Sequence, residues 1–104
     1  MSTKKIETLM STIASLSTTE ETLSFFSDLC SRSELEAMAD RWAIAPLLEQ
    51  GLSYRNIHKM TGISLTTIGR VAQCLQHGAN GYKKALQKLA NATTMIEEAN
   101  RASS

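Results

Sequence analysis

The segment from Ser53 to Leu75 has the residue pattern of a helix-turn-helix, in which two short helices are joined by a turn that contains glycine. The turn of such a motif must reverse the chain within about three or four residues. Gly62 meets this requirement, because glycine takes a left-handed backbone conformation without a side-chain clash. Apolar residues stand where the two helices would face each other, namely Ile57, Ile63, Ile68, Val71 and Leu75. The spacing therefore predicts a helix-turn-helix over residues 53–77, with Ser53 and Ser64 as N-caps.

Charge is unevenly distributed along the 104 residues, although the formal net charge is only +1. Residues 1–49 contain eight acidic and four basic residues, whereas residues 50–96 contain six basic residues and no Asp or Glu. The six basic residues are Arg55, Lys59, Arg70, Lys83, Lys84 and Lys88. A basic region that coincides with a helix-turn-helix favours a polyanion as the partner, and the alternative is an ordinary solvated basic surface.

The rest of the chain also has helical patterns, and its sequence contains no strand pattern, internal repeat or low-complexity linker. Apolar residues recur at intervals of three and four over Lys4–Ser17 and again from Leu23 to Cys30. Further helices are expected over 35–48 and 82–96, and residues 100–104 are expected to fray. We therefore expect one all-α domain of about six helices over residues 1–104.

Several hydroxyl residues have the spacing of helix N-caps. Thr18 and Glu21 form the pattern of a capping box, in which each side chain accepts a hydrogen bond from the other residue's backbone. Ser31 and Ser33 compete as the next cap, because each has a glutamate three residues later.

Pro46 is an anomaly inside the third expected helix. A proline in a helix interior removes one backbone donor and costs about 3 kcal/mol unless the helix bends. We therefore expect a kink or an early break near residues 43–45. Gly51 and Gly78 stand where helices are expected to end.

The residues present disfavour several classes of function. Cys30 and Cys74 are expected to be free, buried thiols in a reducing cytoplasm, because both lie in apolar helical patterns and no secretory signal is visible. A metal site is not expected, because the Cys and His residues lack ligand spacing. No apolar stretch approaches the length that spans a membrane. Catalysis is not expected, because no nucleophile stands beside a positioned base and the basic half contains no paired carboxylates.

The two helices of the motif would have different tasks on double-stranded DNA. The first helix crosses the sugar-phosphate backbone, where the candidate phosphate contacts are Arg55, His58 and Lys59. The first turn of the second helix reaches base edges in the major groove, and threonine can hydrogen-bond bases there. The candidate contacts of this helix are Ser64, Leu65, Thr66, Thr67, Gly69 and Arg70. The alternative for Thr66 and Thr67 is that they are ordinary exposed polar residues.

Two residues depart from the usual helix-turn-helix pattern. The position four before the turn glycine is often alanine, but here it is His58. This residue predicts either a wider helix crossing or a side chain that is tilted towards phosphate. Gly69 lies inside a helix, where glycine costs about 1 kcal/mol relative to alanine. It would permit the close approach of a phosphate, a ligand or a neighbouring helix.

The chain resembles the Trp repressor family, in its shorter Trp-repressor-like branch, through FFSDLCSRSELEAMADR, LLEQGLSYRNI and TGISLTTIGRV. The resemblance runs from about Phe26 to Leu89. It implies an intertwined, all-helical homodimer in the bacterial cytoplasm, with two recognition helices that enter successive major grooves of a roughly palindromic operator. The family's DNA-contacting positions fall on Arg55, His58, Leu65, Thr66, Thr67 and Gly69, and Gly69 lacks a contacting side chain.

The resemblance also implies positions for a tryptophan corepressor, whose indole lies between two arginines in the tryptophan-binding members. These positions fall on Arg41 and Arg70, with Ser31 near the ligand's amino group. The glycine and the serine that follow in those members are Val71 and Cys74 here. The added methyl groups and the lost hydroxyl are expected to fill the pocket with protein. Val71 therefore argues against tryptophan, and no cofactor is expected.

Three functions remain open from the sequence. The leading one is a homodimeric, sequence-specific DNA-binding transcription regulator, expected to be a repressor. The second is the same regulator under the control of an amino acid. The third is a helical dimer that binds another protein and uses the motif only as a scaffold. The acid-free run from Gln50 to Ile96 argues against the third.

Overall fold

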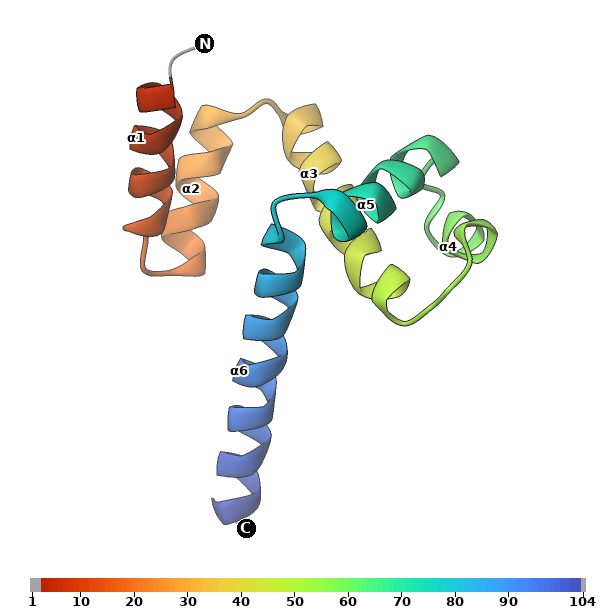
Figure 1. Ribbon diagram of the computed structural model, residues 1–104. Coiled ribbons are helices and arrows are strands. Elements are labelled where there is room, and N and C mark those ends of the chain that lie inside the picture. The colour runs from red at the N-terminus through yellow and green to blue at the C-terminus, as the bar shows by residue number, and fades with distance from the viewer. Residues whose placement is uncertain (1–2, 104) are drawn as a thin grey trace. The chain divides into compact units, whose positions relative to one another are not determined.

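The computed structural model describes residues 3–103 and confirms the all-α class. Every regular element of these residues is an α-helix (Figure 1). The helices are α1 (Thr3–Ala14), α2 (Thr19–Leu29), α3 (Arg32–Glu49), α4 (Tyr54–Thr61), α5 (Leu65–His77) and α6 (Gly81–Ser103). The chain divides into two compact units, Met1–Ala37 and Met38–Ser104, and α3 continues from one into the other.

The first unit holds α1 and α2, which run in opposite directions (Figure 1). Thr18 caps α2 as predicted, because its Oγ1 accepts a hydrogen bond from the backbone N–H of Glu21 at 3.0 Å. The Glu21 carboxylate accepts the N–H of Ser17 at 3.1 Å, one residue earlier than the pattern implies. Helix α1 ends at Ala14 and not at Ser17. Neither helix buries a single described residue within this chain.

Ser31, and not Ser33, caps α3. Its Oγ accepts a hydrogen bond from the backbone N–H of Glu34 at 3.2 Å, and its own N–H donates to the Glu34 carboxylate at 2.8 Å. The two bonds form a complete capping box. The hydrogen bond from the Ser31 backbone, followed by that from its side chain, holds the pKa of Glu34 below its ordinary value.

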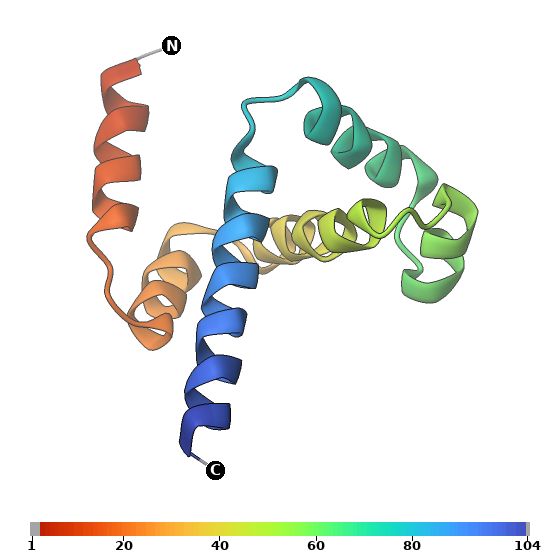
Figure 2. The same cartoon turned by 60° about the horizontal axis from the view of Figure 1, so that its bottom comes forward.

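Helix α3 continues through Pro46 to Glu49, so the expected early break is wrong (Figure 2). Pro46 lies in the last turn, and its carbonyl still accepts the N–H of Gln50 at 3.1 Å. The turn before it buries Ile44 and Ala45 completely. Burial of an isoleucine side chain contributes roughly 1.5–3 kcal/mol, which is comparable to the cost of the proline. Tertiary packing therefore offsets the local penalty.

Gly51 ends α3 in a Schellman motif, as its position predicted. The N–H of Gly51 donates to the carbonyl of Leu48 at 3.0 Å, and the N–H of Leu52 donates to that of Leu47 at 3.3 Å. The apolar side chains of Leu47 and Leu52 both pack against the core. This tight ending brings the chain directly into α4.

The core of the second unit is small and is built by α3, α4 and α5. Its buried members are Ile44, Ala45, Ile57, Ile68 and Val71. Tyr82 and Leu86 of α6 pack against this cluster. The helix-turn-helix is thus held from behind by α3 and α6.

Gly78 ends α5 as predicted, and its N–H donates to the carbonyl of Cys74 at 2.9 Å. A Cβ at this position would collide with that carbonyl, so the close approach requires glycine. Helix α6 then runs to Ser103. Fraying of residues 100–103, which α6 includes, stays a prediction; residue 104 lies outside the described part.

Both cysteines are free, as predicted, but they are not both buried. Cys30 is partly buried and Cys74 is exposed. Cys74 follows Arg70 by four residues, so both lie on one side of α5, beside the apolar stripe and not within it. The apolar pattern predicted the helix correctly, but it did not distinguish the exposed side of α5 that carries Cys74 from the buried side. No helix in the described part of the chain is long and apolar enough to cross a membrane.

The capping box of α3 should make a pH-dependent contribution to stability. The folded-state pKa of Glu34 lies below its ordinary value of 4.5, so the ionised carboxylate favours the folded state. This contribution is fully present above the unfolded pKa and is lost as the pH falls through the lowered folded pKa. Glu34→Gln keeps an acceptor but cannot titrate, so the stability advantage of the wild type in circular-dichroism melts should shrink on acidification below about pH 4.5. A constant difference over this pH range would contradict the assignment.

Candidate nucleic-acid interface

Three residues form the turn between α4 and α5 (Figure 2). Gly62 has φ 75° and ψ 0°, which is the left-handed conformation that the sequence predicted, and its N–H donates to the carbonyl of His58 at 2.8 Å. The Thr61 hydroxyl donates to the carbonyl of Ile57 at 2.7 Å and accepts the N–H of Ile63 at 3.1 Å. The turn is therefore hydrogen-bonded through both backbone and side chains.

The crossing of α4 and α5 is fixed by complete burial of apolar side chains. Ile57 of α4 and Ile68 of α5 are 0% exposed, and Val71 is 1% exposed. They pack with Ile44 of α3 in one cluster. Ile63 and Leu75 lie at its edge and are partly buried, so the predicted inward-facing residues all face the interior. Truncation of such residues to alanine costs about 2–5 kcal/mol in other cores.

Serine N-caps begin both helices of the motif, as predicted. The Oγ of Ser53 accepts the N–H of Asn56 at 3.1 Å, and the Oγ of Ser64 accepts the N–H of Thr67 at 3.2 Å. The Ser64 hydroxyl also donates to Oγ1 of Thr67 at 3.0 Å. Ser64 thus uses its hydroxyl within the chain, where Oγ1 of Thr67 accepts from it.

The remaining candidate contacts lie on the outer face of the motif. Leu65 is 53% exposed, Thr66 is exposed, and Thr67 is partly buried. Arg55, Lys59 and Arg70 are all exposed, and none of them forms an ion pair with a described residue. The motif therefore presents uncompensated positive charge beside the first turn of α5.

Gly69 is not needed for the packing of α4 against α5. A Cβ at this position would lie 3.9 Å from Cε2 of Tyr54, which is an ordinary van der Waals contact. The expectation that this glycine admits a neighbouring helix is therefore wrong within the chain. The approach of a phosphate or a ligand stays a prediction.

The ring of His58 folds back over the turn. Its Nδ1 lies 2.7 Å from the carbonyl oxygen of Ile63, five residues further along the chain. Neither this contact nor the role of Thr61 follows a helical period, so the sequence does not predict them. In the sequence, Gly62 is the one residue that indicates a turn at which nearby side chains form hydrogen bonds.

The residues of the expected corepressor site do not all line one cavity. Arg70 and Cys74 line a small cavity of about 260 Å³ at the end of α5, which does not include Arg41 of α3. Ser31 belongs to the first unit, where its hydroxyl caps α3. Val71 is buried in the core cluster, as the sequence predicted. No group of three or more potential metal ligands is present in the described residues.

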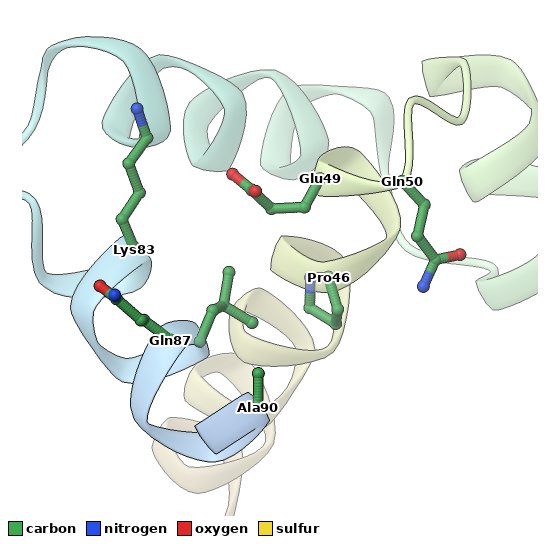
Figure 3. Close-up of a pocket in the computed structure, with 7 residues that line it drawn as sticks. Pro46, Glu49, Gln50, Lys83, Gln87 and Ala90 are labelled. Atoms are coloured by element: carbon green, nitrogen blue, oxygen red, sulfur yellow. The ribbon is translucent and has the colours of Figure 1, made fainter. Parts of the chain in front are cut away.

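Two further hollows lie away from the exposed face of α4 and α5. A groove of about 620 Å³ separates the end of α3 from α6, and Glu49 and Lys83 point into it from opposite walls (Figure 3). An apolar hollow of about 410 Å³ lies beside Trp42 and Tyr82, whose rings stack with centroids 6.4 Å apart. These surfaces are open to solvent in the single chain.

Comparison with known proteins agrees with this geometry. The model of the Trp repressor protein family matches residues 4–90. The uncharacterized protein YerC of Bacillus subtilis (strain 168) is 37% identical over 91 residues, which cover 88% of each chain. The crystal structure of a TrpR like protein from Eubacterium eligens ATCC 27750 has a TM-score of 0.80 at 33% identity, and covers 85% of this chain and 91% of that one.

A second crystal structure, of a proposed Trp repressor from Staphylococcus aureus, also has a TM-score of 0.80, at 31% identity. The match covers 86% of this chain and 89% of that one. Similarity therefore extends over nearly the full length in sequence and in fold. On the strength of the family match and of these relatives, the chain belongs to the Trp repressor family.

Proposed function

We propose that this protein is a transcription regulator that binds a palindromic operator in double-stranded DNA as a homodimer, through α4 and α5. The observation that carries the proposal is the exposed first turn of α5, which is held by a buried core and bordered by unpaired arginine and lysine. Membership in a family of regulatory proteins, and not of enzymes, supports it. Repression is the mode of action that we propose from the family.

The reading of bases is assigned to the first turn of α5. Leu65 offers an apolar side chain that suits the methyl group of thymine, and Thr66 offers an exposed hydroxyl. The helix has 13 residues, so it is about 20 Å long and fits a major groove. Its opposite face is locked by Ile68 and Val71. A rigid helix with an exposed first turn is what direct readout requires.

We assign the phosphate contacts to Arg55 and Lys59. They are four residues apart and therefore share one face of α4. Their charges are exposed and have no acidic partner in the described residues. Contacts of this kind raise affinity for every sequence and make binding dependent on salt.

A homodimer is supported by the surface that the single chain leaves uncovered. Its accessible surface is 8243 Å². Two separate compact bodies of the sizes of its two units would expose roughly 6,900 Å². The excess of roughly 1,300 Å² is the order of area that one partner buries in a stable dimer. The exposed large apolar residues include Ile6, Met10, Leu23, Leu29, Trp42, Leu89 and Ile96.

The proposed regulator does not depend on tryptophan. Val71 belongs to the buried core at the position where the resemblance places space for the ligand. The hydroxyl expected at the next position of the pocket is replaced by the Cys74 thiol. Both features support a regulator whose DNA binding does not need this corepressor.

Removal of the Arg55 charge should weaken binding to all duplexes alike. Arg55→Ala should lower the slope of log affinity against log salt by about one, the value for one lost phosphate contact. The slope can be measured by fluorescence anisotropy with a labelled duplex over a range of salt concentrations. Lys88→Ala is the matched control, because Lys88 is an exposed cation on α6. Equal changes of slope in both variants would contradict the assignment of Arg55 as an anchor.

Substitution of Thr66 should instead change which bases are preferred. Thr66→Ala removes an exposed hydroxyl and should leave the melting temperature nearly unchanged. Discrimination at one base pair should fall by about 1–3 kcal/mol, as measured by competition between operators that differ at that pair. Thr67→Ala should also change base preference, but it removes the acceptor of the Ser64 hydroxyl as well. An unchanged ranking of operators in both variants would remove the first turn of α5 from the reading of bases.

A further inference from the structure

The hydrogen bond between His58 and Ile63 has only one possible direction. Nδ1 of His58 lies 2.7 Å from the carbonyl oxygen of Ile63. A carbonyl oxygen can only accept, so Nδ1 carries the hydrogen and donates it. In the neutral ring, Nε2 then has no hydrogen and can only accept.

The accepting carbonyl lies at the entrance to the recognition helix. Ile63 directly precedes Ser64, the N-cap of α5. On the other side of the turn, the carbonyl of His58 accepts the N–H of Gly62 at 2.8 Å. His58 therefore holds the turn at two points, one through its backbone and one through its ring. The ring bond joins α4 to the residue from which α5 departs.

Arg55 and Lys59, the other basic residues of α4, can contact phosphates without His58. Arg55 and Lys59 are exposed, have no ion pair in the described residues, and suit phosphates by charge. Among the described residues, the side-chain hydrogen bonds at the turn come from His58 and Thr61 and not from Arg55 or Lys59. Phosphate binding by α4 is thus accounted for without the imidazole.

We propose that His58 is a positioning residue, whose ring clamps the end of α4 to the start of α5 and so holds the first turn of α5 in place for contact with DNA. The proposal rests on the proposed DNA-binding function and replaces the assignment of His58 as a phosphate contact. Loss of the clamp leaves the Ile63 carbonyl without this partner and lets the first turn of α5 shift. Base readout, which depends on that turn, should suffer more than general affinity for DNA.

Two amide variants separate the clamp from a direct contact with DNA. In His58→Asn the side-chain amide nitrogen takes the place of Nδ1, so the donor to Ile63 is kept and the outer nitrogen is lost. In His58→Gln the amide nitrogen takes the place of Nε2, so the outer nitrogen is kept and the clamp is lost. Each variant is measured below its melting temperature for affinity to a selected operator and to a scrambled duplex. Amide hydrogen exchange over residues 64–68 is measured in parallel.

The clamp predicts that His58→Asn keeps the ratio of the two affinities and the slow exchange of the wild type. It predicts that His58→Gln lowers this ratio about fivefold to tenfold, the effect of one net hydrogen bond, and exchanges faster. The opposite ranking, or equal behaviour of the two variants, would overturn the proposal. If the wild type prefers no duplex, the proposed function fails and the exchange rates decide alone. Faster exchange in His58→Gln only would then support the clamp, and equal exchange would overturn it.

Discussion

The complete burial of Ile57 against Ile68 and Val71 is the interaction on which the rest of the motif depends. These side chains come from both helices of the helix-turn-helix, and Ile44 of α3 closes the cluster behind them. Because the inner faces of α4 and α5 are locked, their outer faces have a defined orientation. The turn at Gly62, the serine caps and the His58 ring act on a crossing that apolar packing has already set. Loss of this packing would remove the surface that we assign to DNA.

The near-zero net charge of the chain conceals a division between its two halves. The acidic residues of 1–49 lie before the motif, and the acid-free run of 50–96 contains it. In the proposed function, the positive charge of the second half would give affinity for any duplex, and the uncharged side chains at the start of α5 would give preference among sequences. Helices α1 and α2 have no fully buried described residue within one chain, and we propose that they cover a second copy in the homodimer.

Features that depend on neighbouring residues could be predicted from the sequence, and those that depend on tertiary contacts could not. The turn at Gly62, the caps at Thr18, Ser53 and Ser64, and the inward-facing isoleucines follow from local spacing, and the structure confirms them. The sequence shows the local cost of Pro46 in a helix, but it does not show the burial of Ile44 that offsets this cost. The continuation of α3 through Pro46 could therefore not be predicted.

Details of the candidate site were harder to predict from the sequence. The exposure of Cys74 was missed, because an apolar pattern does not fix which edge of its stripe is covered. For His58 the sequence left open a wider helix crossing or a side chain tilted towards phosphate, and it gave no sign of the hydrogen bond to Ile63, which follows no helical period. The roles of Leu65 and Thr66 on DNA stay predictions, because their exposure permits contact without demonstrating it.

Selection of bound sequences from random duplex DNA at near-physiological salt would show whether a homodimer of this protein reads DNA sequence. Two recognition helices that are related by the two-fold axis of a homodimer should enrich an inverted repeat. Its half-site centres should lie about 10–10.5 base pairs apart, or a multiple of that spacing, because each helix enters one major groove. We expect such a repeat to be enriched. The absence of any enriched sequence, or the enrichment of an isolated half-site without a partner, would contradict it.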